Sequence, residues 1–326
     1  MSERQRYPKI GIRSKHELAK RISDINLPYD KALALVNIVL LHFDEYWHDS
    51  KSSQPKKEKY VRTAVGTPLA ELLRRINKKI LAPHDDKVPD FIFGGISGRN
   101  HLQACKTLLG KKRKRVLCGL DISRFFEQIK ESRVSYFFHK KCGCSLEASR
   151  LLASICCVPV GPKKNPTEEK TLARGFATST RLAVWCNLDT FTRVSWKAKQ
   201  ILHRHDPKIM IFVDDIGITA SRASVEKMME VEKAVIDILS HFDVHQPLPI
   251  NFKKTKRKSF SDGAQILGLS LGRKLTVGSK SRSRMDKIRS ALKSVNSPNE
   301  KRALLRKKMG HDRYKRQVDS NSTIKK

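Results

Sequence analysis

The spacing of apolar residues along the chain predicts both helices and short strands. Apolar residues recur three and four positions apart, as on one buried helix face, in "SKHELAKRISDI", "YDKALALVNIVLLHFDEYW", "TPLAELLRRINKKIL" and "SVEKMMEVEKAVIDILSHF". Short apolar runs typical of buried strands occur at 115–121, "RVLCGLD", and on both sides of two aspartates in "IMIFVDDIGITAS" at 209–221. Because helices and short strands alternate, the sequence predicts an α+β fold rather than a sandwich or a pure helical bundle.

The paired aspartates Asp214 and Asp215 stand between two segments that read as strands of a hairpin. A buried carboxylate needs a partner and adjacent carboxylates repel each other, so the pair either lies in a solvated turn or binds something positive. Asp121 also ends a short apolar strand, and side-by-side strands would bring it close to Asp214. Converging carboxylate oxygens favour a Mg²⁺ site, although Asp121 taken alone can also be explained as the N-cap of a helix.

The charge of the chain narrows the class of partner. Its 326 residues include 67 Lys and Arg against 32 Asp and Glu, a net charge of +35, which favours nucleic acid over an anionic membrane surface. Residues 251–326 alone hold 23 basic and 5 acidic residues, with helical spacing in "MDKIRSALKSV" and "EKRALLRKKM". We therefore expect a helical segment that holds nucleic acid rather than merely a solvated face. In such a protein, a carboxylate site with two Mg²⁺ ions suits phosphoryl transfer.

Membrane and disulfide chemistry are not expected. No stretch approaches the roughly 20 apolar residues of a membrane span, and the N-terminus lacks the apolar core of a signal peptide, so we expect a soluble, cytoplasmic protein. The seven cysteines form no regular framework, which favours reduced thiols. The stretch "HKKCGCSLEASRLLASICC" lacks the paired spacing of a zinc site, so buried thiols are favoured there over bound zinc.

Two of these motifs together resemble those of a reverse transcriptase of the bacterial retron type. In that family the first catalytic aspartate is followed, after four residues, by an aromatic residue, as in "DISRFF", and the second lies in an aromatic-x-Asp-Asp hairpin, as in "FVDD" at 212–215. The resemblance implies that Asp121 and Asp214 hold two Mg²⁺ ions and that Asp215 assists. It also implies that Phe126 excludes a 2′-hydroxyl at the nucleotide sugar, although phenylalanines more often belong to a core. Phe212 would then lie with the primer and template.

Further segments extend the resemblance over about residues 60–275. "LARGFATSTRLAVW" is similar to the family's Gln-Gly-x-x-x-Ser-Pro segment, which backs the template and the incoming nucleotide. Gly175 and Ser179 match this segment, whereas Arg174 stands where the family has Gln and Thr180 where it has Pro.

The remaining motifs concern the triphosphate and the primer. Lys254, in "NFKKTKRKSF", resembles a lysine that contacts the nucleotide's phosphates, and Arg62 resembles the arginine that approaches the triphosphate. Gly268 and Leu269, in "AQILGLSLG", resemble the centre of a turn that grips the primer.

The resemblance implies a right-hand polymerase with three parts: an N-terminal helical extension (1–59), fingers and palm (60–272) and a basic helical thumb (273–326). The polar stretch "HDSKSSQPKKEK" at 48–59 is expected to be the linker before the second part. The implied activity is RNA-directed DNA synthesis, in which dNTPs are added to a primer on an RNA template, so an RNA–DNA hybrid forms.

A retron enzyme would also use a structured non-coding RNA as template and primer, make a branched RNA–DNA product (msDNA) and serve in phage defence. An effector or toxin protein would then be a further partner. Two alternatives remain open at this point. One is a non-retron defence or intron-derived reverse transcriptase, and the other is a non-catalytic RNA-binding protein on a polymerase scaffold.

Overall fold

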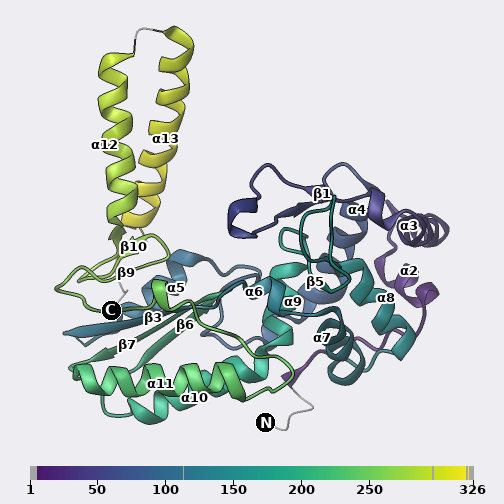
Figure 1. Ribbon diagram of the computed structural model, residues 1–326, viewed down its shortest axis with the longest axis horizontal. Helices are drawn as coiled ribbons and strands as arrows, with labels where there is room; N and C mark the ends of the chain where they lie inside the picture. Colours follow the sequence, from purple (N-terminus) through teal and green to yellow (C-terminus); the bar gives the residue numbers. More distant parts are fainter. Residues whose placement is uncertain (1–5, 113, 296, 321, 323–326) are drawn as a thin grey trace.

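A four-stranded antiparallel sheet with strand order β6-β7-β3-β8 lies at the centre of one half of the molecule (Figure 1). The structure is a computed structural model that describes residues 6–112, 114–295, 297–320 and 322. Its strands are β6 (Lys208–Phe212), β7 (Asp215–Ser221), β3 (Arg115–Asp121) and β8 (Lys256–Ser259). The predicted strands at 115–121 and around the paired aspartates are therefore confirmed, and so is the mixed α+β fold.

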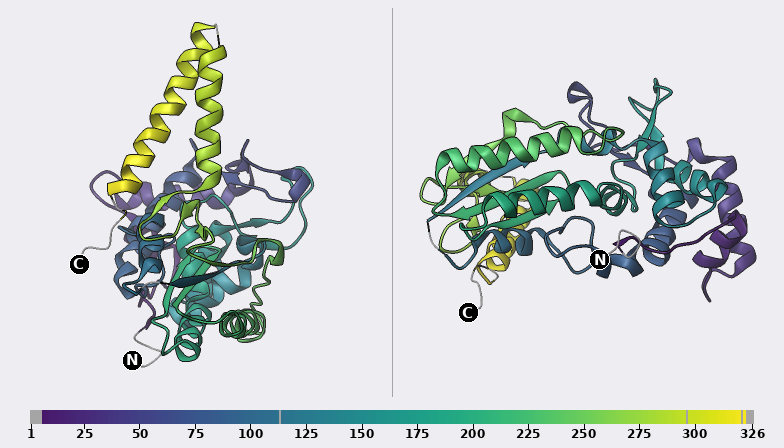
Figure 2. Two further views of the ribbon diagram at one scale, coloured as in Figure 1. Left: turned by 90° about the vertical axis from the view of Figure 1, so that its left-hand side faces the viewer. Right: turned by 90° about the horizontal axis from the view of Figure 1, so that it is seen from below.

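Helices cover both faces of this sheet. Helices α10 (Leu188–Ile201) and α11 (Val225–His241) pack side by side on one face, as Figure 2 shows from below, and α5 (His101–Leu109) packs against β6 and β7. Side chains of a strand alternate between faces, so Ile209 and Ile211 join one hydrophobic core while Met210 joins another. Burial on both faces explains the nearly continuous apolar sequence of these strands.

A mostly helical region lies beside the sheet, at the other end of the molecule (Figure 1). The helices predicted near the N-terminus and at 67–81 are confirmed, and the latter ends in a π-helical turn at Ile76–Leu81. The region contains α2 (Lys15–Ile22), α3 (Tyr29–Leu41), α4 (Pro68–Arg75), α7 (Glu131–Tyr136), α8 (Leu146–Cys156) and α9 (Ser179–Cys186). All seven cysteines are buried free thiols, as the sequence predicted.

Two short hairpins project from the helical region: β1 (His48–Asp49) pairs with β2 (Arg62–Thr63), and β4 (Cys157–Pro159) pairs with β5 (Lys170–Leu172). The prediction of a separating linker at 48–59 is wrong, because these residues form most of the first hairpin. Backbone hydrogen bonds such as Ser50 N to Val61 O (2.7 Å) join its two arms. Polar residues can form such an arm because the opposite arm satisfies their backbone groups. The predicted boundary at 59/60 thus falls inside one structural unit.

The C-terminal part is a helical hairpin on a small sheet. Strands β9 (Gln265–Ile266), β10 (Leu269–Ser270) and β11 (Thr276–Val277) lead into α12 (Ser279–Ser294) and α13 (Pro298–Ser320), which project from the body (Figures 1 and 2). These helices agree with the predicted ones.

The end of α13 anchors the hairpin to the body. Val318 is fully buried in the second hydrophobic core, which is the one that contains Met210 and Leu269. The Tyr314 ring stacks on His101 with ring centroids 5.9 Å apart. Among the described helices, none combines the length and the apolar character that crossing a bilayer requires.

A buried arginine joins β3 to its surroundings. The side chain of Arg115 is 1% exposed; its Nη1 lies 2.8 Å from Asp206 Oδ2, and its Nε donates to Thr219 Oγ1 at 3.1 Å. The guanidinium therefore ties the start of β3 both to β7 and to the loop before β6. Asp206 also pairs with Lys208 at 3.1 Å and is 21% exposed, so removal of Arg115 chiefly costs the buried hydrogen bonds of the guanidinium.

We predict that Arg115→Met lowers the free energy of unfolding by about 2 kcal/mol, measured by chemical denaturation, because the buried hydrogen bonds to Asp206 and Thr219 are lost. Arg289→Met is the control, since Arg289 and Asp286 form an exposed pair at 3.6 Å, and its effect should stay below about 1 kcal/mol. Equal effects of the two substitutions would contradict the structural role of Arg115.

Candidate functional site

The sheet brings three carboxylates together at one edge. Asp121 ends β3 and is paired in register with Asp215, the first residue of β7. Side chains directly opposite on antiparallel strands share a face, with Cβ atoms about 5 Å apart. Asp214 lies in the two-residue turn between β6 and β7, and its carbonyl accepts a hydrogen bond from Ile122 N at 2.8 Å. The sequence predicted Asp214 beside Asp121; the residue directly opposite Asp121 is Asp215, and Asp214 approaches from the turn.

The two alternative explanations of these aspartates do not agree with the structure. The helix after β3, α6 (Phe125–Gln128), has Arg124 as its N-cap residue, so Asp121 is not a helix cap. Asp214 and Asp215 are half-buried, so their turn is not simply solvated. What remains is a site that concentrates negative charge.

The turn that carries Asp214 is strained and supported from outside. Val213 has φ +58°, a left-handed conformation that β-branched residues rarely adopt and that costs about 1–3 kcal/mol. Ile211 N donates to Phe91 O and Phe93 N donates to Ile211 O (both 2.8 Å). These two backbone hydrogen bonds hold a loop along β6. Gly94 of this loop approaches so closely that a Cβ there would lie 2.5 Å from Val213 N. Strain of this kind persists where surrounding structure enforces it, often at functional sites.

Burial and mutual repulsion dominate the electrostatics of this site. Desolvation, followed by the charges of Asp214 and Asp121, raises the pKa of Asp215 to about 7. Desolvation and the charge of Asp121 also raise the pKa of Asp214. Lys254 is a counter-charge, with Nζ 2.6 Å from Asp121 Oδ1 and 3.0 Å from Oδ2, and this hydrogen bond raises the pKa of Lys254. The charges of Lys254, Arg174 and Lys256 lower these carboxyl pKa values only in part, so those of Asp214 and Asp215 stay raised and a bound cation would be favoured.

Lys254 reaches Asp121 because the chain before it runs beside the end of β3. Asn251 N donates to Asp121 O (2.8 Å) and Ser123 N donates to Pro249 O (2.7 Å). The 3-10 turn Phe252–Lys254 follows directly, which brings the lysine back over the carboxylates. Lys254, which we expected at the phosphates of a nucleotide, therefore lies beside Asp121.

The donor chemistry of the site fits Mg²⁺. Carboxylate oxygens are hard ligands, and two of the three carboxyl groups have raised pKa values that a bound cation would lower. Across the described ranges, no set of three or more His, Cys, Asp and Glu side chains is already arranged as a metal site. At Asp121 the position of a cation is taken by the ammonium of Lys254.

Arg174, whose charge opposes the rise in the pKa of Asp214, also contacts Phe126. The Phe126 ring is 7% exposed, and the guanidinium of Arg174 lies over it at 5.0 Å. Arg174 binds Glu127 through two hydrogen bonds, Nε to Oε1 at 3.2 Å and Nη2 to Oε2 at 3.0 Å. Sequence reasoning missed Glu127, because nothing in a residue 47 positions from Arg174 signals that the two meet.

The Gly175 segment is fixed by close backbone packing. Gly175 has φ +108°, and a Cβ there would lie 2.4 Å from Arg62 O. Arg62 N donates to Arg174 O at 2.7 Å, so β2 lies directly against this segment. Ser179 begins α9, and its buried hydroxyl donates to Ala173 O. Backbone packing therefore favours a glycine at 175, and a backbone hydrogen bond holds the side chain of Ser179.

Among the residues that the structure describes, the Arg62 guanidinium forms no hydrogen bond or ion pair with Asp121, Asp214 or Asp215. Its guanidinium pairs with Asp49, donates to Pro159 O at 3.1 Å and lies over the rings of Trp47 and Tyr60 at 5.0 and 5.2 Å. Burial lowers its pKa to about 10. The structure thus places Arg62 as a clamp between the two short hairpins, whereas the sequence led us to expect it at a triphosphate.

The remaining predicted residues border the second core. Leu267 and Gly268 form the turn between β9 and β10, Leu269 is fully buried, and Gly278 N donates to Gly268 O at 3.0 Å. Phe212, the last residue of β6, packs against the same core. Gly268 and Leu269 therefore lie at the base of the helical hairpin.

The sequence matches no protein-family model and no curated protein.

The raised pKa of Asp215 predicts a pH-dependent stability. Folded Asp215 keeps its proton up to a pH of about 7, whereas the unfolded residue releases it near 3.8, so the free energy of unfolding falls as the pH rises between these values. Asp215→Asn removes this titration. In metal-free buffer its Tm should exceed that of the wild type at about pH 8, and by clearly less at about pH 5, measured by scanning fluorimetry.

The control is Asp90→Asn, because the Asp90 side chain is fully exposed and its replacement should not change the pH dependence. The same Tm difference for Asp215→Asn at both pH values would contradict the prediction.

Proposed function

We propose that the protein is an RNA-directed DNA polymerase, in which the sheet of β3 and β6–β8 is the palm and the helical hairpin α12–α13 is the thumb. The fingers would be the helical region with the β1–β2 and β4–β5 hairpins. The observation that carries the proposal is the register that sets Asp121 opposite Asp215, with Asp214 in the turn between β6 and β7. Three carboxylates at a sheet edge in a chain of net charge +35 suit a polyanionic substrate.

The proposed reaction is attack of a primer hydroxyl on the α-phosphate of a dNTP, with pyrophosphate leaving. Asp121, Asp214 and Asp215 would hold two Mg²⁺ ions, which supply charge stabilisation at the attacking and leaving oxygens. Lys254 already reaches this edge of the sheet. It would contact the nucleotide's phosphates once a bound cation replaces its ammonium at Asp121. Phe126 would lie at the sugar.

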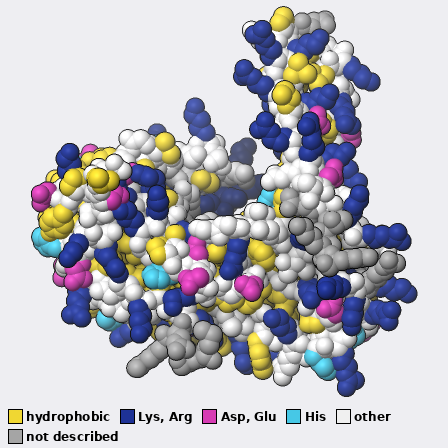
Figure 3. Space-filling view, turned by 180° about the vertical axis from the view of Figure 1, so that it is seen from behind, with side chains coloured by type: hydrophobic (Ala, Val, Ile, Leu, Met, Phe, Trp, Pro, Cys, Tyr) yellow, Lys and Arg dark blue, Asp and Glu magenta, His cyan; other side chains and the backbone are white. Residues whose placement is uncertain are grey.

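The helical hairpin would hold part of the nucleic acid. A groove of about 840 Å³ runs between α12 and α13, with Arg284, Lys287 and Lys307 on its walls and Ile288 and Leu304 among its apolar residues. Figure 3 shows Lys and Arg side chains gathered along the hairpin. A basic surface of this kind neutralises phosphates without reading sequence.

The resemblance of the ordered motifs supports a retron-type enzyme among reverse transcriptases. Its template and primer would be a structured non-coding RNA, its product a branched RNA–DNA molecule, and its role phage defence together with an effector protein. Sequencing the nucleic acid that co-purifies with the protein tests this assignment. A linear product, or an RNA of an intron, would instead place the protein with the non-retron reverse transcriptases.

We predict that the double variant Asp214→Asn, Asp215→Asn loses Mg²⁺-dependent dNTP incorporation on a primed RNA template by at least about a thousandfold, because the metal ligands lose their charge. Mg²⁺ should raise the Tm of the wild type and not that of the variant, since an ion that binds only the folded protein stabilises it.

RNA binding should stay largely unchanged in that double variant, which separates loss of chemistry from loss of folding. Asp90→Asn serves again as the control for removal of a carboxylate. Full residual synthesis in the double variant would refute the proposed active site.

We predict that replacing Arg284, Lys287 and Lys307 by Gln weakens RNA binding and lowers the slope of log K against log salt by about 1 for each phosphate that is no longer neutralised. This triple variant is preferable to truncation after Gly278, because Val318 is part of the second core. Affinity measured by fluorescence anisotropy across a salt series provides the test.

The control variant replaces Arg13, Lys20 and Lys31, which are exposed at or near the N-terminal helices. It removes the same charge at the opposite end of the molecule (Figure 1). Equal reductions of the salt slope in the two triple variants would show that the hairpin is not the principal binding surface.

A further inference from the structure

The surroundings of Phe126 point to a pair of residues that sets its position. We propose that Glu127 and Arg174 are positioning residues that hold the Phe126 ring and thereby set the preference for deoxynucleotides over ribonucleotides. The inference rests on the proposed function, and it deepens it by assigning two residues to the specificity of that site.

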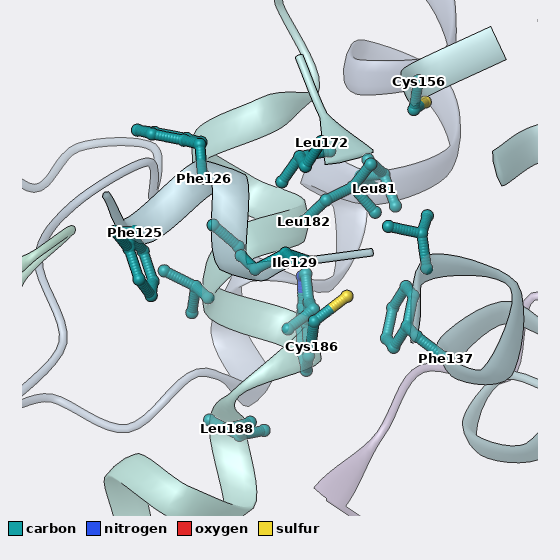
Figure 4. Close-up of a cluster of buried hydrophobic side chains, with 14 of the residues drawn as sticks. Leu81, Phe125, Phe126, Ile129, Phe137, Cys156, Leu172, Leu182, Cys186 and Leu188 are labelled. Atoms are coloured by element: carbon teal, nitrogen blue, oxygen red, sulfur yellow. The ribbon is translucent and has the colours of Figure 1, made fainter. Parts of the chain in front are cut away.

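Phe126 belongs to the same hydrophobic core as Phe125 but is the more exposed of the two. Its helix, α6, has only four residues and follows Arg124, which has φ +49°. Phe125 is fully buried, whereas in Figure 4 Phe126 leaves α6 in a different direction and lies at the margin of the cluster. The two rings touch at a centroid distance of 5.7 Å with planes tilted by 60°. A ring at the margin needs a further contact to keep one orientation.

Arg174 supplies that contact, and Glu127 fixes Arg174. The guanidinium lies 5.0 Å from the centre of the Phe126 ring, within the range of a cation–π interaction. The two parallel hydrogen bonds to Glu127 define the plane of the guanidinium, and both side chains are only about 15% exposed. Because the bonds are bidentate and shielded, they restrict the orientation of the guanidinium and so of the ring beneath it.

The pair also explains what an arginine does at a position where the resembled family has Gln. A glutamine can neither stack a cation on Phe126 nor bind Glu127 through a fork. The hydrogen bonds of the Arg174 fork are already directed at Glu127, so the side chain is less suited to a direct contact with template phosphates. It acts on the substrate through Phe126.

The test compares full-length wild type with Glu127→Gln, Arg174→Gln and Arg174→Lys. For each protein, kcat/KM is measured for dCTP and CTP on one DNA-primed RNA template with Mg²⁺. Each substitution should lower the preference for dCTP about tenfold, which corresponds to about 1.4 kcal/mol. Arg174→Lys keeps the charge and loses the fork, so it should resemble Arg174→Gln.

The dependence on the ring is tested in a Phe126→Ala background. There, Glu127→Gln should cause no further loss of sugar preference, because no ring remains to be positioned. A merely structural role of the ion pair would lower kcat/KM for both nucleotides and leave their ratio unchanged.

A matched ion pair elsewhere in the chain provides the control. Arg133 binds Asp243 at 2.5 Å, both side chains are similarly shielded, and Arg133 lies over the Tyr136 ring at 5.4 Å. Asp243→Asn should therefore reduce stability and leave the nucleotide preference unchanged.

The possible outcomes separate the two proposals. Unchanged preference in Glu127→Gln, full preference in Arg174→Lys, or an equal loss in Asp243→Asn would overturn the positioning role while the polymerase assignment stands. No dNTP incorporation by the wild-type protein would overturn the proposed function and this inference with it.

Discussion

The repulsion among three carboxylates is the constraint around which the rest of the structure is arranged. Asp121 and Asp215 are paired across two central strands, and Asp214 adds a third negative charge from the turn. Desolvation adds to this repulsion and raises the pKa of both Asp214 and Asp215. Such a cluster persists only because the sheet that holds it is stabilised elsewhere.

The stabilising contacts come from several elements around the sheet. Two cores cover its faces, Arg115 ties the far end of β3 to β7, and the loop ending at Gly94 presses against the strained turn at Val213. Segment 249–254 then brings Lys254 onto Asp121. The site thus combines clustered carboxylates with an ammonium group close by, which suits the recruitment of cations and phosphates together.

The surroundings of Phe126 differ in kind from the carboxylate cluster. Glu127 and Arg174 form a shielded, bidentate pair whose guanidinium lies over the Phe126 ring, and the charge of Arg174 also opposes the rise in the pKa of Asp214. The same pair lies beside the backbone contact between Arg62 and Gly175, so the β1–β2 hairpin, the Gly175 segment and α6 form one packed unit. This packing gives Arg62 a structural role, because its guanidinium is fully engaged with Asp49 and two carbonyl groups.

Local patterns in the sequence determined most elements and much of the site. Apolar spacing was sufficient to predict the strands at 115–121 and around the paired aspartates, the main helices and the basic helical hairpin, because period and burial are local properties. Tertiary structure decided which aspartate opposes Asp121, since strand register depends on packing across the sheet. It also decided that residues 48–59 pair as a hairpin arm, that Arg62 is a clamp, and that Glu127 meets Arg174. Each of these is a contact between segments distant in sequence, for which no local pattern carries the information.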